Sequence, residues 1–191
     1  MGAALKQAWR GASLPWGAAR QAVQNIIDHL NAAYPSANLS LEKGVAPVLP
    51  SSAVAAGSAL TVIAASHGGR LIQLDTATGS TVTLPAATGS GLEVECVVTV
   101  LATSNSHVIK VANSTDIMVG YVINQDTDTS NAFAGFNTTS TSDTITLNRT
   151  TTGSVSIGER FKLRDVKAGF WTVEGYTTST GSPATPFSAT V

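Results

Sequence analysis

The sequence predicts a mainly β fold, an antiparallel β-sandwich or barrel of jelly-roll-like form, preceded by an N-terminal α-helical arm. From about residue 70 to the C-terminus, short runs of alternating apolar and polar residues are separated by Gly, Ser, Thr and Asn. Such runs, spaced by roughly 8–12 residues, are typical of sandwiches and barrels. Helical spacing of apolar residues occurs only before residue 42. We therefore expect a helical arm at 1–41, an extended linker at 42–58 and a β body at 59–191.

The arm is predicted from an apolar stripe along one face of a helix. Ser13 is a suitable N-cap, Pro15 fits the first turn, and Pro35 ends the helix because it restricts the residue before it. An isolated helix of this length is marginal in water, so the stripe needs a partner surface. Trp side chains add the large apolar area that anchors interfaces. The residues predicted to bind the partner are Leu5, Trp9, Trp16, Val23, Ile26, Ile27, Leu30 and Tyr34.

The linker is predicted from residues that interrupt regular structure, namely Pro47, Pro50 and Gly57. Apolar residues such as Val45 and Val48 argue against a freely solvated tether. We therefore expect the linker to lie along a surface.

The β body is predicted from runs such as Thr81–Leu84, in which apolar residues take every second place. This alternation indicates one buried and one solvated face. The expected strands are 60–65, 70–75, 81–84, 92–102, 107–112, 116–123, 143–147, 154–165, 169–175 and 186–191.

The segment 124–142 is too long for a tight turn and carries Phe133 and Phe136. Loops of this length are commonly functional or interfacial. The two Phe side chains could be exposed at a binding surface or could tuck under the loop, and we favour the second arrangement.

The composition argues against several classes of protein. Charged residues make up only 12% of the chain and the formal net charge is −1, so the positive field that attracts nucleic acid is missing. The single cysteine, Cys96, excludes an internal disulfide. There is no apolar run long enough for a membrane span and no export signal of the usual kind, so we expect synthesis in the cytoplasm.

No group of residues has the spacing of a metal or catalytic site. The three histidines, at positions 29, 67 and 107, lack a Cys or carboxylate at ligand spacing. Asp126 and Asp128 resemble the start of a calcium loop, but Asn131 and Asn137 stand where that loop requires Gly and Glu. No nucleophile elbow occurs. We expect no enzyme activity, no cofactor and no metal.

Two predicted strands carry charge on one face. Glu93 and Glu95 lie two residues apart and could mimic a glycosidase pair, but a solvated strand face is the favoured interpretation. Arg160, Lys162 and Arg164 likewise share one face, which we expect to meet solvent or a protein partner rather than nucleic acid.

Four stretches of the body carry a family resemblance. They are GGRLIQLDTATGSTVTLPAATGSGLEVECVVTV at 68–100, NSHVIKVANSTDIMVG at 105–120, STSDTITLN at 140–148 and STGSPATPFSATV at 179–191. The body, over about residues 58–191, resembles the head decoration, or cement, proteins of tailed bacteriophages. These stretches are turn-and-strand signatures rather than catalytic motifs, and phage tail proteins share similar modules.

The resemblance implies a non-enzymatic β domain, often a homotrimer, on the outer surface of the virion capsid. Its partners would then be the major capsid protein and other copies of the chain, with no nucleic acid and no membrane. The helical arm could dock on the capsid, on a sister subunit or on its own β body.

Two other classes remain as alternatives. A receptor- or carbohydrate-binding module of a tail fibre or spike would expose aromatic residues, for which Phe133, Phe136 and Tyr176 are the candidates. An enzyme such as a glycan depolymerase would need an Asp/Glu constellation that the sequence does not offer.

Overall fold

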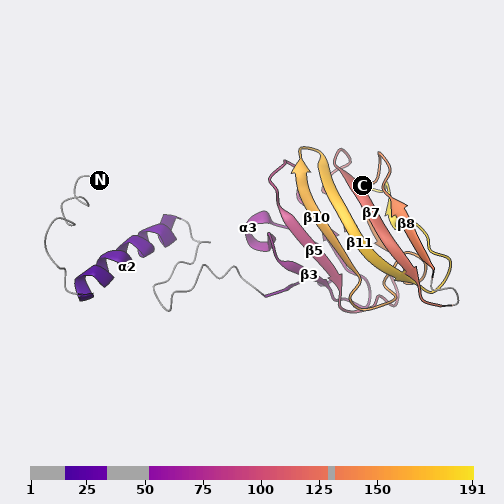
Figure 1. Cartoon of the computed structure of the whole chain (residues 1–191), viewed down its shortest axis with the longest axis horizontal. Helices are drawn as coiled ribbons and strands as arrows, with labels where there is room; N and C mark the ends of the chain where they lie inside the picture. The colour runs from indigo at the N-terminus through magenta and orange to yellow at the C-terminus, as the bar shows by residue number, and fades with distance from the viewer. Residues whose placement is uncertain (1–15, 34–51, 129–131) are drawn as a thin grey trace. The chain divides into compact units, whose positions relative to one another are not determined.

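The alternating segments of the chain form β-strands, and the protein is mainly β, as predicted (Figure 1). In the computed structural model, the described residues are 16–33, 52–128 and 132–191, and the side chains described in the first segment are those of 21–30 and 32. The chain divides into two units between Ser51 and Ser52. The first unit contains helix α2 (Trp16–Ala33), and the second contains the strands.

The second unit contains two sheets. The large sheet has the strand order β1-β3-β5-β10-β11-β7-β8, and the small sheet has the order β12-β9-β6-β4-β2. The strands of the large sheet are β1 (Val54–Ala55), β3 (Leu71–Leu74), β5 (Glu93–Val98), β7 (Ile117–Asp126), β8 (Phe133–Asn137), β10 (Arg160–Lys167) and β11 (Phe170–Ser179). Those of the small sheet are β2 (Ala59–Thr61), β4 (Thr81–Thr83), β6 (His107–Lys110), β9 (Thr144–Leu147) and β12 (Phe187–Ser188).

Both sheets are mixed, so the prediction of an antiparallel fold is wrong. From β1 to β6 the chain alternates between the two sheets. Each strand therefore pairs in parallel with the next strand but one, as in β1 with β3, β3 with β5, β2 with β4 and β4 with β6. Strands β11 and β7 form a further parallel pair.

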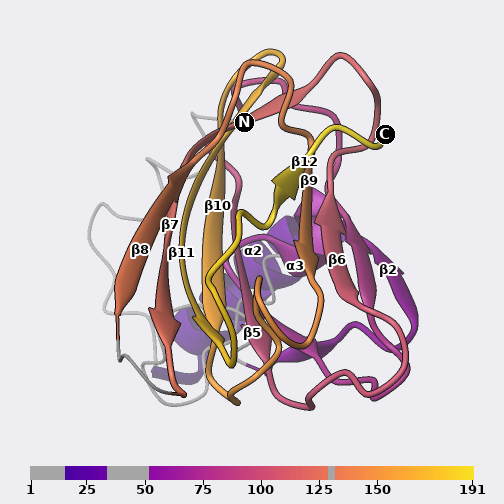
Figure 2. The same cartoon turned by 90° about the vertical axis from the view of Figure 1, so that its right-hand side faces the viewer.

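One apolar core lies between the two sheets, which face each other in Figure 2. The large sheet contributes residues such as Ile72, Phe161 and Trp171, and the small sheet contributes Val82 and Ile109, all fully buried. Removing such side chains from water at roughly 25 cal/mol per Å² is the main stabilising contribution. The alternation of the sequence thus positions one face of each sheet in the core and leaves the other face outside.

Several predicted boundaries differ from the structure. The end of the expected strand 60–65 is the start of a short helix, α3 (Ala64–His67), and the first half of the expected strand 154–165 is a turn. Strand β8 lies within the predicted loop 124–142, and β1 lies within the predicted linker. No helix among the described residues is long and apolar enough to cross a membrane.

Candidate functional site

The outer face of the large sheet carries the most distinctive surface of the described β unit. Residues two apart on a strand point to the same side, so each strand presents one row of side chains on this face. Register pairs Glu93 of β5 with Arg164 of β10, and Arg164 with Thr172 of β11. Thr172 in turn pairs with Val119 of β7. Four rows therefore lie side by side on this face. They are an acidic row on β5 (Glu93 and Glu95), a basic row on β10 (Arg160, Lys162 and Arg164), a mixed row on β11 (Thr172, Glu174 and Tyr176) and an apolar row on β7 (Val119, Tyr121 and Ile123).

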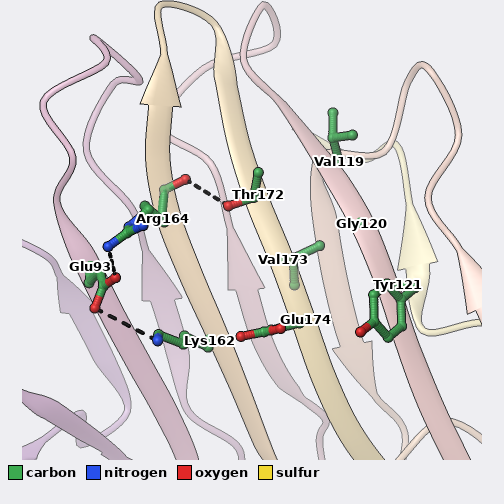
Figure 3. Close-up of a pocket in the computed structure, with 9 residues that line it drawn as sticks. All are labelled: Glu93, Val119, Gly120, Tyr121, Lys162, Arg164, Thr172, Val173 and Glu174. Carbon is green, nitrogen blue, oxygen red and sulfur yellow. Dashed lines mark hydrogen bonds and ion pairs between the residues drawn. The ribbon is translucent and has the colours of Figure 1, made fainter.

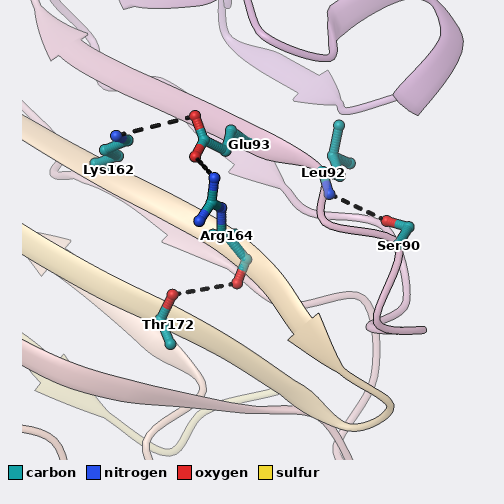
Figure 4. A network of polar contacts seen from close by, with 6 residues as sticks. All are labelled: Ser90, Leu92, Glu93, Lys162, Arg164 and Thr172. Atoms are coloured by element: carbon teal, nitrogen blue, oxygen red, sulfur yellow. Dashed lines mark hydrogen bonds and ion pairs between the residues drawn. The ribbon is translucent and has the colours of Figure 1, made fainter.

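The acidic and basic rows are joined by ion pairs (Figure 4). Glu93 forms ion pairs with Arg164 and with Lys162, the second at 3.9 Å. Arg160 forms an ion pair with Glu95 at 3.8 Å. These side chains are between one third and two thirds exposed, so each pair adds little to the folding free energy. The predicted solvated face of Glu93 and Glu95 is confirmed.

A groove runs over β11 between the basic row and the apolar row (Figure 3). Its upper part has a volume of about 340 Å³ and its lower part about 370 Å³. Both parts are lined by Tyr121, Lys162 and Glu174, so they adjoin. The upper part also reaches Val119 and Arg164, and we call the two parts together the β11 groove.

The apolar row is unusually exposed for aliphatic and aromatic side chains. Tyr121 is 49% exposed, and Val119 and Ile123 on the same strand are each 43% exposed. Tyr176 lies beside Ile123 in register, and its hydroxyl donates a 2.5 Å hydrogen bond to Gln125. The ring of Tyr176 is therefore held in place at one end of the β11 groove.

The two Phe residues of the predicted loop are divided between the two arrangements considered for them. Phe136 packs against the core from the inner side of β8, whereas Phe133 is 67% exposed. Tyr176 is partly exposed, as the carbohydrate-binding alternative requires. Tyr121 was missed as a candidate, because its position beside β11 depends on a pairing between distant segments.

The predicted partner-binding residues of the arm are seen only in part. Val23, Ile26 and Leu30 on α2 are 40–47% exposed, and Ile27 is half-buried. Leu5, Trp9 and Tyr34 lie outside the described residues, as does the side chain of Trp16. Elsewhere on α2, Gln21 bonds to Asn25 and Gln24 to Asp28. Three of the four predicted partner-binding side chains described on α2 are thus exposed.

Two buried carboxylates hold loops rather than a ligand. Asp165 is 1% exposed and accepts hydrogen bonds from the backbone N–H groups of Thr88, Gly89 and Ser90 at 2.7–3.1 Å, and from two of their hydroxyls. Burial opposes ionisation, but these hydrogen bonds outweigh it and hold the pKa of Asp165 well below its usual range. Glu159 accepts three backbone N–H groups of 154–156 and the hydroxyl of Thr178.

Two further titratable side chains, His107 and Cys96, are buried in the β unit. His107 is fully buried; its Nδ1 accepts the N–H of Ser80, and its Nε2 lies 2.9 Å from the carbonyl of Val100. Burial lowers the pKa of His107, with the Val100 contact opposing. Cys96 lies in the core, where burial raises the pKa of its thiol to about 12. Within residues 16–33, 52–128 and 132–191, no three His, Cys, Asp or Glu residues could together hold a metal ion.

Comparison with known proteins adds no relative. No protein-family model, no curated protein and no solved structure matches the chain.

Proposed function

We propose that this chain is a structural protein of a tailed-bacteriophage virion that binds the outside of the capsid as a homotrimer. In this proposal the β unit is a sandwich-like scaffold with two mixed sheets, α2 belongs to a docking arm, and the major capsid protein is the partner. The observation that carries it is the exposure of apolar side chains on one side of α2, where Val23, Ile26 and Leu30 are each at least 40% exposed. Because an apolar helix face is stable only when buried, it supports binding to another subunit.

The spacing of the exposed residues also supports self-association. Val23, Ile26 and Leu30 follow one another at intervals of three and four residues. Such intervals define the a and d positions of a coiled coil, at which helices of neighbouring copies pack. The half-buried Ile27 lies next to this seam and widens it. The same stripe is therefore available to a sister subunit or to the capsid.

The mechanism needs no chemistry. A protein that binds only the assembled shell stabilises it by RT ln(1 + [L]/Kd) at each site, and many identical sites add their contributions. Maturation of the shell would create or complete the binding surface.

Binding to purified expanded capsids tests the proposal, with intact host cells as the competing target. We expect saturable binding to capsids and a trimer mass in solution. Leu30→Lys should lower capsid affinity at least about tenfold, which corresponds to about 1.4 kcal/mol. Ala32→Lys, an exposed position elsewhere on the helix, is the matched control and should bind normally. Saturable binding to cells but not to capsids, or normal binding by Leu30→Lys, would overturn it.

A further inference from the structure

We propose that the β11 groove binds a neutral hexose oligosaccharide. This inference rests on the outer face of the large sheet alone and does not require the capsid role proposed above.

The shape of the groove follows from the side chains on three adjacent strands. Strand β11 forms the floor, where Thr172 and Glu174 face outward. The long basic side chains of β10 form one wall, and the apolar row of β7 forms the other (Figure 3). Between Thr172 and Tyr176 the floor extends for roughly 13 Å, at about 3.3 Å per residue. This length accommodates about two or three sugar rings in line.

The two walls match the two kinds of surface on a hexose. A sugar ring has an apolar face of C–H groups, which can lie on an aromatic ring or an aliphatic side chain. Tyr121 and Tyr176 offer such rings at the groove. Because Tyr176 is already held by Gln125, little conformational entropy is lost when a ligand covers it.

The opposite wall and the floor match the hydroxyl groups of a sugar. Each hydroxyl can donate and accept a hydrogen bond. Two neighbouring hydroxyls can therefore pair with two N–H groups of a guanidinium or with the two oxygens of a carboxylate. Glu174 supplies an acceptor at the junction of the two parts of the groove. Arg164 and Lys162 line the wall with their charged ends paired to Glu93, and the N–H groups that these ion pairs do not use supply donors.

The charge balance favours a neutral ligand. The charged groups at the groove are three cations and three carboxylates: Arg160, Lys162, Arg164, Glu93, Glu95 and Glu174. Their formal charges cancel, so the groove has no excess of positive charge to attract a polyanion such as nucleic acid.

The sheet geometry disfavours an extended peptide as the occupant. Strand β11 is paired on both sides, with β10 and with β7, so its backbone cannot form a further ladder with a bound chain. A peptide would have to satisfy its own backbone groups with side chains of the groove alone, whereas a sugar presents no such row of amides.

Titration of the full-length protein with maltohexaose, cellohexaose and mannohexaose, followed by amide chemical shifts, tests the inference. We expect at least one of the three to bind with a Kd on the order of 0.1–1 mM, since an open groove buries only part of the ligand. The shifting amides should be those of β7, β10 and β11. Tyr121→Ala should weaken binding at least tenfold, and Glu174→Gln should weaken it several-fold.

The control variant is Ile157→Ala, which truncates a 70% exposed apolar residue that does not line the groove. It should bind like the unmodified chain. Absence of shifts with all three sugars, shifts outside the three strands, or full affinity in both groove variants would overturn the inference. Capsid binding is measured separately, so its failure would not affect this result.

Discussion

Replacing Asp165 with Asn should destabilise the β unit strongly although the side chain keeps its size. The carboxylate lies at the end of β10 and holds the turn of Thr88, Gly89 and Ser90 through three backbone N–H groups and two hydroxyls. In Asp165→Asn, an NH2 group replaces one carboxylate oxygen and faces donors that it cannot accept from. At least one backbone N–H group of the turn then loses its acceptor on the buried side chain.

The magnitude follows from the number of hydrogen bonds affected. A hydrogen bond to a charged group contributes about 1.5–3 kcal/mol, and a buried donor left without an acceptor costs a similar amount. The loss of two such interactions predicts a decrease of about 3–6 kcal/mol in the free energy of unfolding. This is a large part of the 5–15 kcal/mol that is typical of a domain.

Urea unfolding followed by circular dichroism, at pH 7 and at pH 3, measures this effect and its pH dependence. Because the pKa of Asp165 is lower in the folded than in the unfolded chain, its contribution is present above the ordinary aspartate pKa near 3.8. That contribution is lost as the pH falls toward the folded pKa. The difference in stability between the unmodified chain and Asp165→Asn should therefore be smaller at pH 3 than at pH 7.

Glu174→Gln is the matched control, because it neutralises an exposed carboxylate on the neighbouring strand. It should change the free energy of unfolding by less than about 0.5 kcal/mol. A change of that small size in Asp165→Asn, or an equal difference at both pH values, would refute the argument that the carboxylate holds the turn.

Three further predictions concern the core. Gly175→Ala should lower the free energy of unfolding by about 1–3 kcal/mol, because its Cβ atom would lie 2.6 Å from the ring of Phe161. Gly135→Ala on β8 is the control in the same urea assay, and it should leave the stability unchanged because its Cβ atom would meet nothing within 4 Å. The lowered pKa of His107 keeps it neutral, so stability should fall as the pH drops from about 6.5, where the unfolded chain takes up the proton first. His107→Leu should be less stable at pH 7 yet show a weaker pH dependence between 7 and 5. Cys96 should resist a thiol reagent at pH 8 in the folded chain and react in urea, and rapid labelling without denaturant would contradict its burial.

The sequence predicts the faces of strands better than their directions. In β5 the alternation of Glu93, Val94, Glu95 and Cys96 identifies the outward and inward sides correctly, because the side-chain period of a strand is two. The same pattern is compatible with a parallel or an antiparallel neighbour. The alternation of β1 to β6 between sheets, which makes those pairs parallel, has no local signature.

Two local errors have identifiable physical causes. The residues before β10 read as strand because Val155 and Ile157 alternate with polar residues, yet Ile157 is 70% exposed in a turn. The carboxylate of Glu159 fixes that turn by accepting three successive backbone N–H groups, an interaction that hydrophobic pattern does not report. Strand β8 was missed because Phe133 and Gly135 occupy its exposed side, which has Asn137 as its one polar residue.

Only the charged half of the candidate site could be predicted from the sequence. The acidic and basic rows are visible in the sequence, because each lies on one strand. The β11 groove also needs Tyr121 beside Glu174, a pairing between segments separated by more than forty residues. No spacing within either segment indicates that contact, so the apolar wall was not identified as part of a site.

The two proposed binding surfaces lie on different units of the chain, so their contributions can be separated by single substitutions. Leu30→Lys on α2 should lower capsid binding and leave sugar binding unchanged, since the β11 groove contains no residue of α2. Tyr121→Ala should lower sugar binding and leave capsid binding unchanged. If Tyr121→Ala instead lowers capsid binding while the sugars produce no shifts, the outer face of the large sheet is a protein-binding surface. Exposed apolar residues beside ion-paired charges would then act as the centre and rim of that interface.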